Sequence, residues 1–202
     1  MTSALWIKVC GLTTTDAVRA AVDAGVNAVG FVFAESKRRV TALQAAELAR
    51  DVPRGILRVA VMLHPSQAEL DEVWSQFRPD VLQTDADDLA TLQVPAGLNV
   101  TPVFRAGREL PATLPTRLLF EGPVSGTGET TDWSAAARLA ARTQLILAGG
   151  LQPSNVAAAI AVARPFGVDV SSGVEARPGV KDPRKIYDFV RNARGADNGA
   201  MQ

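Results

Sequence analysis

The sequence has few of the residues that build disulfide frameworks, zinc sites and histidine-based catalytic pairs. Its 202 residues include one cysteine, Cys10, and one histidine, His64. A lone cysteine excludes an internal disulfide, and one cysteine with one histidine falls short of the ligand set of a structural zinc site. A single unpaired thiol is also typical of proteins in reducing compartments. His64 is still compatible with one histidine-based site.

The sequence also lacks an excess of either charge and a long apolar run. Lys plus Arg and Asp plus Glu both number 21, so nothing in the net charge of +0 favours nucleic acid or an anionic membrane as a partner. No apolar run approaches the roughly 20 residues of a membrane-spanning helix. The segment after Met1 lacks the apolar core and cleavage site of a signal peptide. We therefore expect a cytoplasmic protein that binds neither nucleic acid nor a membrane and holds any anion through local contacts.

The length and composition fit one globular domain. Hydrophobic residues make up 47% of the chain and charged residues 21%. This hydrophobic content is sufficient for one well-buried core. No segment rich in Pro, Gly or Ser divides it, so we expect a single domain over residues 1–202. Residues 195–202 are small and polar, and we expect them to form a frayed tail.

Short apolar runs alternate with longer Ala-rich segments of helical period along the whole chain. Such alternation is typical of strands that are each followed by a helix. Runs that are apolar at every position indicate strands buried on both faces, as in parallel sheets covered by helices. The eight predicted strands are residues 5–9, 28–33, 56–63, 81–82, 100–104, 118–120, 145–148 and 168–170. The seven predicted helices are residues 15–24, 42–51, 67–77, 86–92, 134–141, 155–163 and 183–192.

These elements predict an α/β fold, a single-domain (β/α)8 barrel at the small end of its usual size range. Only the irregular segment 107–115 follows the fifth predicted strand, so the fifth helix is short or irregular. Ser66 with Glu69 indicates a capping box at one helix start, and Asp182 before Pro183 marks another. A doubly wound open sheet of the same elements is the alternative.

In such a barrel the functional residues lie where the strands end and the following loops begin. The residues directly after each predicted strand are therefore the candidates for the site. They are Cys10 and Gly11; Glu35, Ser36, Lys37, Arg38 and Arg39; His64; Gln83, Thr84 and Asp85; Arg105; Glu121 with the loop 122–128; Gly149 and Gly150; and Asp169, Ser171, Ser172 and Gly173.

The turns after the seventh and eighth predicted strands carry the clearest signal. Gly149 and Gly150 allow a backbone to approach a ligand closely. The segment that begins Ser171-Ser172-Gly173 is able to open a short extra helix whose free N–H groups point at an anion. Glycines alone are equally compatible with tight turns. Because these two loops are the customary phosphate site of the barrel, their coincidence favours phosphate binding.

Cys10 and Glu121 are the candidate catalytic residues. A lone cysteine among apolar residues is usually a small core residue. However, Cys10 ends a strand, where a nearby cation or helix N-terminus lowers a thiol pKa from about 8.5 toward neutrality. A thiolate there is able to act as a base or as a nucleophile. Glu121 directly follows a buried strand, a position that suits a general acid of raised pKa or an exposed loop residue.

The charged cluster around Arg38 and the lone His64 are open to simpler interpretations. The run Ser36-Lys-Arg-Arg39 is compatible with a solvated surface cluster. On a strand-end loop, one arginine instead clamps a carboxylate through two parallel hydrogen bonds. We expect His64 to be a loop residue without a catalytic role.

Motifs along nearly the whole chain resemble those of the phosphoribosylanthranilate isomerase family of tryptophan biosynthesis. They occur in the family's order and at strand ends, which makes the resemblance specific. The motifs are Lys8-Val-Cys-Gly-Leu12, Gly30-Phe-Val-Phe33, Ser36-Lys-Arg38, Ala148-Gly-Gly-Leu151, Pro153-Ser-Asn-Val156, Gly167-Val-Asp-Val-Ser-Ser-Gly-Val-Glu175, Pro178-Gly179 and Lys181-Asp182.

The resemblance implies an isomerase that converts N-(5-phosphoribosyl)anthranilate into 1-(2-carboxyphenylamino)-1-deoxyribulose 5-phosphate. This Amadori rearrangement, the third step of tryptophan biosynthesis from chorismate, needs no cofactor and no metal. It requires an acid to protonate the ring oxygen and a base to remove the proton from C2. The resemblance makes Cys10 the base and puts Glu121 at the position of the acid. The expected substrate-binding residues are Arg38, for the anthranilate carboxylate, and Asp169; the expected phosphate-binding residues are Gly149, Gly150, Ser171, Ser172 and Gly173.

Two positions depart from the family pattern. The family's usual acid is aspartate, whereas this strand ends in Glu121, whose side chain reaches one methylene further. After the fourth strand the family often has Gln-Leu-His-Gly, whereas this chain has Gln83-Thr84-Asp85. We therefore do not expect Gln83 and its neighbours to be essential.

Two other functions remain open from the sequence. A different phosphosugar barrel enzyme, such as an aldose-ketose isomerase of the histidine pathway or a ring-closing synthase, would use carboxylates or a lysine, for which Lys8 is the candidate. A phosphate-binding barrel without activity would keep the anion turns, and Glu121 would mark a lost aspartate. No long exposed apolar stripe demands a partner, so we expect a monomer or a homodimer.

Overall fold

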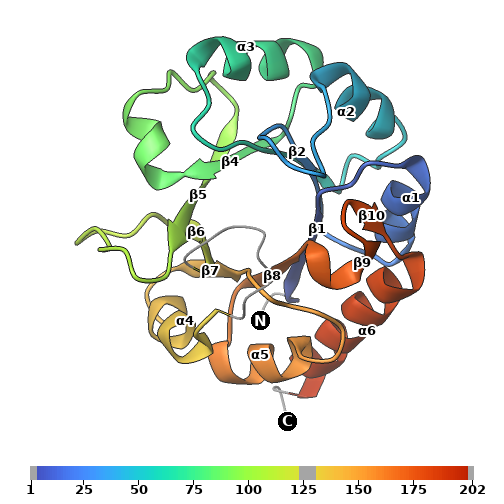
Figure 1. Cartoon of the computed structure of the whole chain (residues 1–202). Coiled ribbons are helices and arrows are strands. Elements are labelled where there is room, and N and C mark those ends of the chain that lie inside the picture. Colours follow the sequence, from blue (N-terminus) through green and yellow to red (C-terminus); the bar gives the residue numbers. More distant parts are fainter. Residues whose placement is uncertain (1–3, 123–130, 200–202) are drawn as a thin grey trace.

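Eight parallel strands close into a barrel in the computed structural model, which describes residues 4–122 and 131–199 (Figure 1). Each strand pairs with the next, and β8 closes the ring onto β1 with Lys8 opposite Asp169. The predicted (β/α)8 barrel is confirmed and the open-sheet alternative is wrong. The strands are β1 Trp6–Cys10, β2 Ala28–Val32, β3 Leu57–Val61, β4 Val81–Asp85, β5 Asn99–Arg105, β6 Arg117–Glu121, β7 Gln144–Leu147 and β8 Gly167–Val170.

Helices surround this ring of strands, as Figure 1 shows. Six of the seven predicted helices are α-helices, and five of them have bounds close to those expected. They are α1 Thr15–Asp23, α2 Ala42–Leu48, α3 Gln67–Gln76, α4 Trp133–Ala140, α5 Val156–Ala163 and α6 Pro183–Gly199. Within the described residues, segment 107–115 forms no helix, so the irregular connection after β5 is confirmed.

The prediction of an α-helix over residues 86–92 is wrong. The segment is a short 3-10 helix, η1 Ala86–Ala90. Asp85, at the N-cap position, makes no side-chain cap hydrogen bond there. Its carboxylate instead accepts hydrogen bonds from Arg105. The carboxylate of Asp85 thus binds within the barrel interior rather than at the start of η1.

The last helix extends beyond its predicted end. α6 continues to Gly199, so the segment expected to fray from residue 195 is helical as far as residue 199. Asp197 explains this extension, because its Oδ2 accepts a hydrogen bond of 2.9 Å from the backbone N–H of Leu5. Arg194 adds a hydrogen bond to the Leu5 carbonyl oxygen and one of 3.0 Å to Asn27 Oδ1. These contacts fasten the C-terminal helix to the start of β1.

Two predicted helix starts are confirmed. Ser66 and Glu69 form the expected capping box at the start of α3. Asp182 Oδ1 accepts hydrogen bonds from the backbone N–H groups of Arg184 and Lys185. Capping of this kind satisfies N–H groups that have no partner within the helix.

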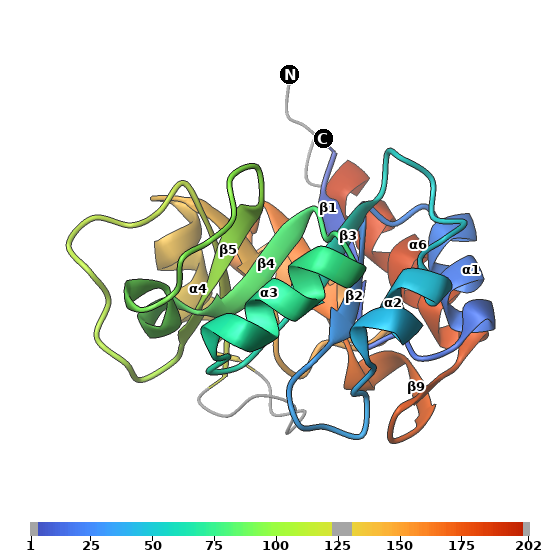
Figure 2. The same ribbon diagram turned by 90° about the horizontal axis from the view of Figure 1, so that it is seen from above.

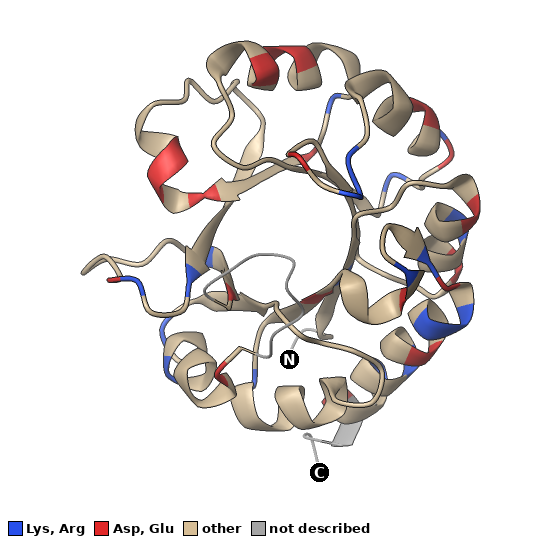
Figure 3. Ribbon diagram, viewed as in Figure 1, with Lys and Arg blue, Asp and Glu red and all other residues tan. Residues whose placement is uncertain are grey.

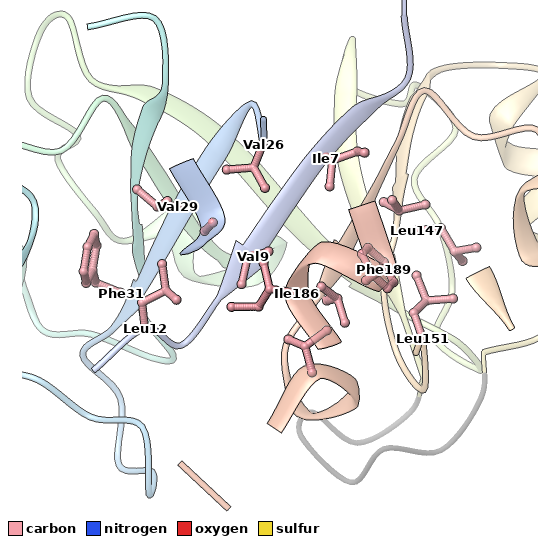
Figure 4. Close-up of a cluster of buried hydrophobic side chains, with 14 of the residues drawn as sticks. Ile7, Val9, Leu12, Val26, Val29, Phe31, Leu147, Leu151, Ile186 and Phe189 are labelled. Atoms are coloured by element: carbon pink, nitrogen blue, oxygen red, sulfur yellow. The ribbon is translucent and has the colours of Figure 1, made fainter. Parts of the chain in front are cut away.

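Alternate residues of each strand face the barrel interior, which decides where the polar side chains lie. In β1, Ile7 and Val9 belong to the large apolar cluster between strands and helices. Figure 4 shows them in the same cluster as Ile186 and Phe189 of α6. Lys8 alternates with them and therefore faces the interior. The same alternation applies around the ring.

The two ends of the barrel differ. Trp6 packs against both small clusters of interior apolar residues and so fills the end where the strands begin. At the other end lie the loop after β2 and the hairpin that contains β9 (Figure 2). This hairpin, β9 Glu175–Arg177 with β10 Val180–Lys181, follows a short 3-10 helix, η2 Ser172–Val174. The short helix was predicted from the sequence and the hairpin was not.

Charged residues of both signs are distributed around the ring of helices and loops (Figure 3). None of the helices in the described part of the chain is both long and apolar enough to cross a membrane.

Candidate active site

A cavity of about 390 Å³ lies at the carboxyl ends of the strands. Its volume falls within the range of small-molecule sites. It brings together all the predicted site residues except Gly173, which directly follows a lining residue. The predicted residues that line it are Cys10, Arg38, Glu121, Gly149, Gly150, Asp169, Ser171 and Ser172.

Lys8, Cys10 and Asp169 form the buried part of the site, which we call the Cys10 cluster. Lys8 Nζ lies 2.6 Å from Asp169 Oδ2, and the lysine side chain is only 1% exposed. The other carboxylate oxygen, Asp169 Oδ1, is buried and has no hydrogen-bond partner among the described residues. Buried polar atoms are normally satisfied. This oxygen is therefore a free acceptor for a donor group on a ligand.

Burial raises the pKa of the Cys10 thiol above its ordinary value. The positive charge of Lys8 opposes this effect and does not overcome it, while Asp169 adds to it. The prediction that a neighbouring cation brings this thiol pKa toward neutrality is therefore wrong. For Lys8, burial lowers the pKa, but Asp169 and Cys10 together hold it above its ordinary value. At neutral pH the free protein thus carries a protonated thiol beside a charged ammonium group.

Gly30 in β2 provides the space that the Cys10 cluster occupies. A Cβ atom at this position would lie 3.1 Å from Cys10 Sγ and 3.1 Å from Lys8 Cε. The Gly30 carbonyl oxygen also accepts hydrogen bonds from the N–H groups of Gly11 and Leu12, at 2.9 and 3.1 Å. Gly30 lies in a family motif, but this role was not predicted from the sequence. The signal was a glycine inside a buried strand, which often marks a close approach of other atoms.

Arg38 comes from the loop after β2 and is held by a glutamate from the hairpin after β8. Its Nε lies 2.6 Å from Glu175 Oε1 and its Nη2 lies 3.1 Å from Glu175 Oε2. Lys181 Nζ donates to Glu175 Oε1 at 3.0 Å and to the Ser171 carbonyl oxygen at 2.9 Å. Arg38 therefore reaches the cavity with its orientation fixed, and the same network contacts the turn after β8.

The charges of this network also stabilise the carboxylate form of Glu175. Burial raises its pKa, but Arg38 and Lys181 outweigh burial and hold the pKa below its usual range. Burial lowers the pKa of Lys181, which Glu175 only partly offsets. Sequence reasoning missed the roles of Glu175 and Lys181, although both lie in the quoted motifs. Their pairing depends on the hairpin, which was not predicted.

The two glycine turns after β7 and β8 lie against each other. Gly149 and Gly150 have φ angles of 89° and 65°, a left-handed region that favours glycine. Asn155 fastens their turn, because its Nδ2 donates to the Gly150 carbonyl oxygen at 2.9 Å. A Cβ atom on Gly173 would lie 1.9 Å from the Leu151 carbonyl oxygen. All three glycines therefore permit tight turns, and Gly149 and Gly150 also line the cavity.

Asp85, Arg105 and Glu121 form a chain of charges at the ends of β4, β5 and β6, which we call the Glu121 cluster. Arg105 Nη1 lies 2.5 Å from Glu121 Oε1, and Arg105 Nη2 lies 2.6 Å from Asp85 Oδ1. All three residues line the cavity. Residues 123–128 of the predicted glycine-rich loop lie outside the described residues.

His64 does not line this cavity. This position agrees with the expectation that His64 is a loop residue without a catalytic role. Its Nδ1 lies 2.7 Å from Asp88 Oδ1, and this contact raises the pKa of the exposed imidazole. Gln83, which the sequence analysis discounted, is buried and lines the cavity. Within the described residues, no three His, Cys, Asp or Glu side chains gather so as to hold a metal ion.

Comparison with known proteins supports the resemblance found in the motifs. A model of the family described as N-(5'-phosphoribosyl)anthranilate (PRA) isomerase matches residues 7–192. N-(5'-Phosphoribosyl)anthranilate isomerase from Streptococcus pneumoniae (strain Hungary19A-6) is 39% identical over 196 residues, which are 96% of this chain and 98% of that protein.

Solved structures give the same result. The crystal structure of TrpF from Jonesia denitrificans is 38% identical, with a TM-score of 0.79 over 96% of this chain and 98% of that one. A phosphoribosyl anthranilate isomerase solved in complex with reduced 1-(o-carboxyphenylamino)-1-deoxyribulose 5-phosphate is 29% identical. Its TM-score is 0.75 over 95% of this chain and 99% of that one.

Proposed function

The chain belongs to the N-(5'-phosphoribosyl)anthranilate isomerase family, and we propose that Cys10 and Glu121 are the base and the acid of its reaction. The protein is an isomerase of tryptophan biosynthesis that converts N-(5'-phosphoribosyl)anthranilate into 1-(2-carboxyphenylamino)-1-deoxyribulose 5-phosphate. The observation that carries the catalytic assignment is the single cavity lined by Cys10, Glu121 and the two glycine turns. An acid, a base and a candidate anion site thus border the same space.

The substrate carries a phosphate, a carboxylate and hydroxyl groups, and the cavity offers a partner for each. The phosphate binds at the turns formed by Gly149, Gly150, Ser171, Ser172 and Gly173. The anthranilate carboxylate binds to Arg38, whose guanidinium group is oriented by Glu175. Asp169 Oδ1, buried and without a partner among the described residues, accepts a hydrogen bond from a substrate hydroxyl. These contacts hold the sugar between the two catalytic groups.

The first chemical step opens the sugar ring. The Glu121 carboxyl group donates its proton to the ring oxygen while the bond from that oxygen to C1 breaks. The nitrogen lone pair forms a double bond to C1, which leaves an iminium cation. The positive charge acidifies the hydrogen on C2 and prepares the second step. General acid catalysis of this kind requires a carboxyl group within hydrogen-bond reach of the leaving oxygen.

In the second step Cys10 acts in its thiolate form, after its thiol proton has passed to water, and removes the proton from C2. The electrons of the C–H bond form a double bond between C1 and C2 and neutralise the iminium nitrogen. The resulting enol passes its hydroxyl proton to the Glu121 carboxylate and takes up at C1 the proton held by the Cys10 thiol, which yields the 2-ketone and restores both groups. No atoms are gained or lost, as an isomerisation requires. The Lys8 ammonium group beside Cys10 stabilises the thiolate as it forms, and Asp169 keeps that ammonium group in place.

We propose that the protein works in the cytoplasm as a monomer or a homodimer. The lone thiol of Cys10 suits a reducing compartment. Because one chain supplies all the residues assigned above, a single copy is sufficient for the reaction, and its partner is a small phosphosugar.

Rescue of a tryptophan auxotroph that lacks this isomerase tests the proposal in cells. Purified Cys10→Ala and Glu121→Gln proteins are expected to lose about a hundredfold or more in kcat, the usual contribution of a positioned base or acid. Gly195→Ala is the matched control, because a Cβ atom there meets nothing within 4 Å. Near-normal turnover of either catalytic variant removes that residue from its assigned role. Failure of the wild-type chain to rescue growth overturns the proposed function itself.

A further inference from the structure

Asp85 and Glu121, the two strand ends that depart from the family pattern, are joined by one side chain, that of Arg105. We infer that Arg105 and Asp85 are positioning residues that hold the Glu121 carboxyl group at the cavity. This inference rests on the proposed role of Glu121 as the acid. If it is correct, the departures from the family pattern at Asp85 and at Glu121 belong to one arrangement and are not two separate losses.

The geometry of Arg105 fixes the direction of its guanidinium group. Nη2 lies 2.6 Å from Asp85 Oδ1 and Nε lies 3.2 Å from Asp85 Oδ2, so the two groups meet through two bonds. A fork-to-fork contact of this kind sets the plane of the guanidinium group as well as its position. The third group, Nη1, is then directed at Glu121 Oε1, 2.5 Å away.

The strand register brings the three groups together. Arg105 of β5 is the direct register partner of Glu121 of β6, and Asp85 of β4 is paired with Val103, two residues before Arg105. The side chains of Asp85, Arg105 and Glu121 are 7%, 9% and 16% exposed. Attraction between opposite charges is stronger at such partly buried positions than in water. Removing either partner therefore disturbs Glu121 more than the loss of a surface ion pair would.

Glutamate needs this support more than aspartate does. Its side chain has one more rotatable bond, so an unrestrained carboxyl group samples more positions at the cavity wall. Proton transfer depends on the reacting atoms being held within hydrogen-bond distance, and a small displacement is costly. The bond from Arg105 Nη1 restricts this freedom on one carboxylate oxygen.

Arg105 also remains charged, which keeps the arrangement intact. Burial lowers the pKa of Arg105, but Asp85 and Glu121 outweigh burial and hold it above its ordinary value. Asp85 supplies a second negative charge, so Glu121 does not have to neutralise the guanidinium group alone.

The test replaces each positioning residue by its conservative variant. Arg105→Lys keeps the charge and loses the fork, and Asp85→Asn keeps the shape and loses the charge. Each variant is expected to lower kcat about tenfold, because the carboxyl group is no longer held in place. KM is expected to stay within twofold of wild type, because neither residue is assigned to substrate binding.

A second arginine–aspartate pair, joined by two bonds but more exposed than the first, provides the control. Arg58 and Asp80 form a two-point ion pair at the beginning of β3, with 3.0 and 3.2 Å contacts, on the far side of the barrel from the cavity. Arg58→Lys and Asp80→Asn are expected to leave kcat within twofold of wild type. Thermal midpoints measured for all four variants separate a loss of stability from a loss of turnover.

The outcomes are distinguishable from failure of the proposed function. If Glu121→Gln is inactive while Arg105→Lys and Asp85→Asn keep kcat within twofold, the positioning role is overturned and the acid survives. If Glu121→Gln turns over normally, the acid itself is wrong. The inference is also overturned if the control variants Arg58→Lys and Asp80→Asn lose as much kcat as Arg105→Lys and Asp85→Asn. If Arg105→Lys does not fold, Asp85→Asn decides by the same kcat criterion.

Discussion

The Cys10 cluster and the Glu121 cluster lie on opposite sides of one cavity and are built in different ways. In the first, a neutral thiol lies buried beside one ion pair, that of Lys8 and Asp169. In the second, a more exposed carboxyl group ends a chain of three charges. The first consists of residues that match the family motifs, and the second contains both departures from them. The base thus depends on its electrostatic environment, and the acid depends on its orientation.

This difference predicts where each half is vulnerable. Lys8 is the cation that favours the Cys10 thiolate most, with a smaller contribution from Lys181, so losing the Lys8 charge removes much of the base's activity. The Glu121 cluster has charges on both sides of Arg105, so a conservative change there should weaken the acid without abolishing it. Substitutions in the two halves should therefore differ in size as well as in kind.

The largest effect is expected from Lys8→Met. It removes the charge beside Cys10 and leaves Asp169 as a buried unpaired carboxylate. We expect kcat to fall roughly a thousandfold, within the range that a positioned base contributes. Stability should fall by about 3–5 kcal/mol, the usual cost of leaving one partner of a buried ion pair alone. Steady-state kinetics and urea unfolding measure the two effects.

The double variant Lys8→Met with Asp169→Asn is the control for this prediction. It removes both charges, so we expect much of the stability to return while turnover stays low. Recovery of turnover together with stability would contradict the role of Lys8 at Cys10.

A smaller effect is expected from Gly173→Ala, which tests the wall that both halves share. Its Cβ atom would lie 1.9 Å from the Leu151 carbonyl oxygen, so the turn after β8 must shift. We expect kcat/KM to fall about a hundredfold, because a displacement of about 1 Å at a positioning contact has this cost. Inhibition by inorganic phosphate should weaken as well. Unchanged phosphate inhibition would remove this turn from the anion site.

The smallest effect is expected from His64→Asn, which tests how far the Glu121 cluster extends outward. His64 has a φ angle of 48°, a conformation that asparagine tolerates, and lies outside the cavity lining. We expect kcat and KM to stay within about twofold of wild type, since surface changes of this kind have small effects. A tenfold loss of kcat would show that the His64–Asp88 pair belongs to the acid side of the site.

The barrel itself could be predicted from the sequence, because the apolar runs are short and all but the fifth are followed by a helical segment. The positions of Cys10, Glu121 and the glycine turns followed from the same pattern, since the carboxyl ends of parallel strands meet at one end of the barrel. The partner of the Asp85 carboxylate could not be predicted, because that carboxylate binds Arg105 of the neighbouring strand rather than the N–H groups of the segment that follows it.

The side-chain partners inside the site could not be predicted. Arg105 is separated by 20 residues from Asp85 and by 16 from Glu121, and their contact depends on the register of three strands. The direction of the Cys10 pKa shift depends on how completely the closed barrel buries the thiol, which outweighs the neighbouring charge of Lys8. Long-range register and burial are properties of the folded chain rather than of a motif.

The pH dependence of kcat/KM in the Glu121→Gln background, with and without Cys10→Ala, tests the central claim most directly. Glu121→Gln removes the titration of the acid, whose protonated fraction falls with rising pH while the thiolate fraction increases. Because the thiol pKa is raised, Cys10 is protonated in the free protein at neutral pH, and each unit of pH increases the thiolate fraction about tenfold. We therefore predict that kcat/KM of Glu121→Gln rises about tenfold per unit between about pH 6 and 8, since this quantity reports the groups of the free enzyme. The double variant should lose this rise. A flat Glu121→Gln profile, or a double variant that keeps the rise, would contradict the assignment of Cys10 as the base.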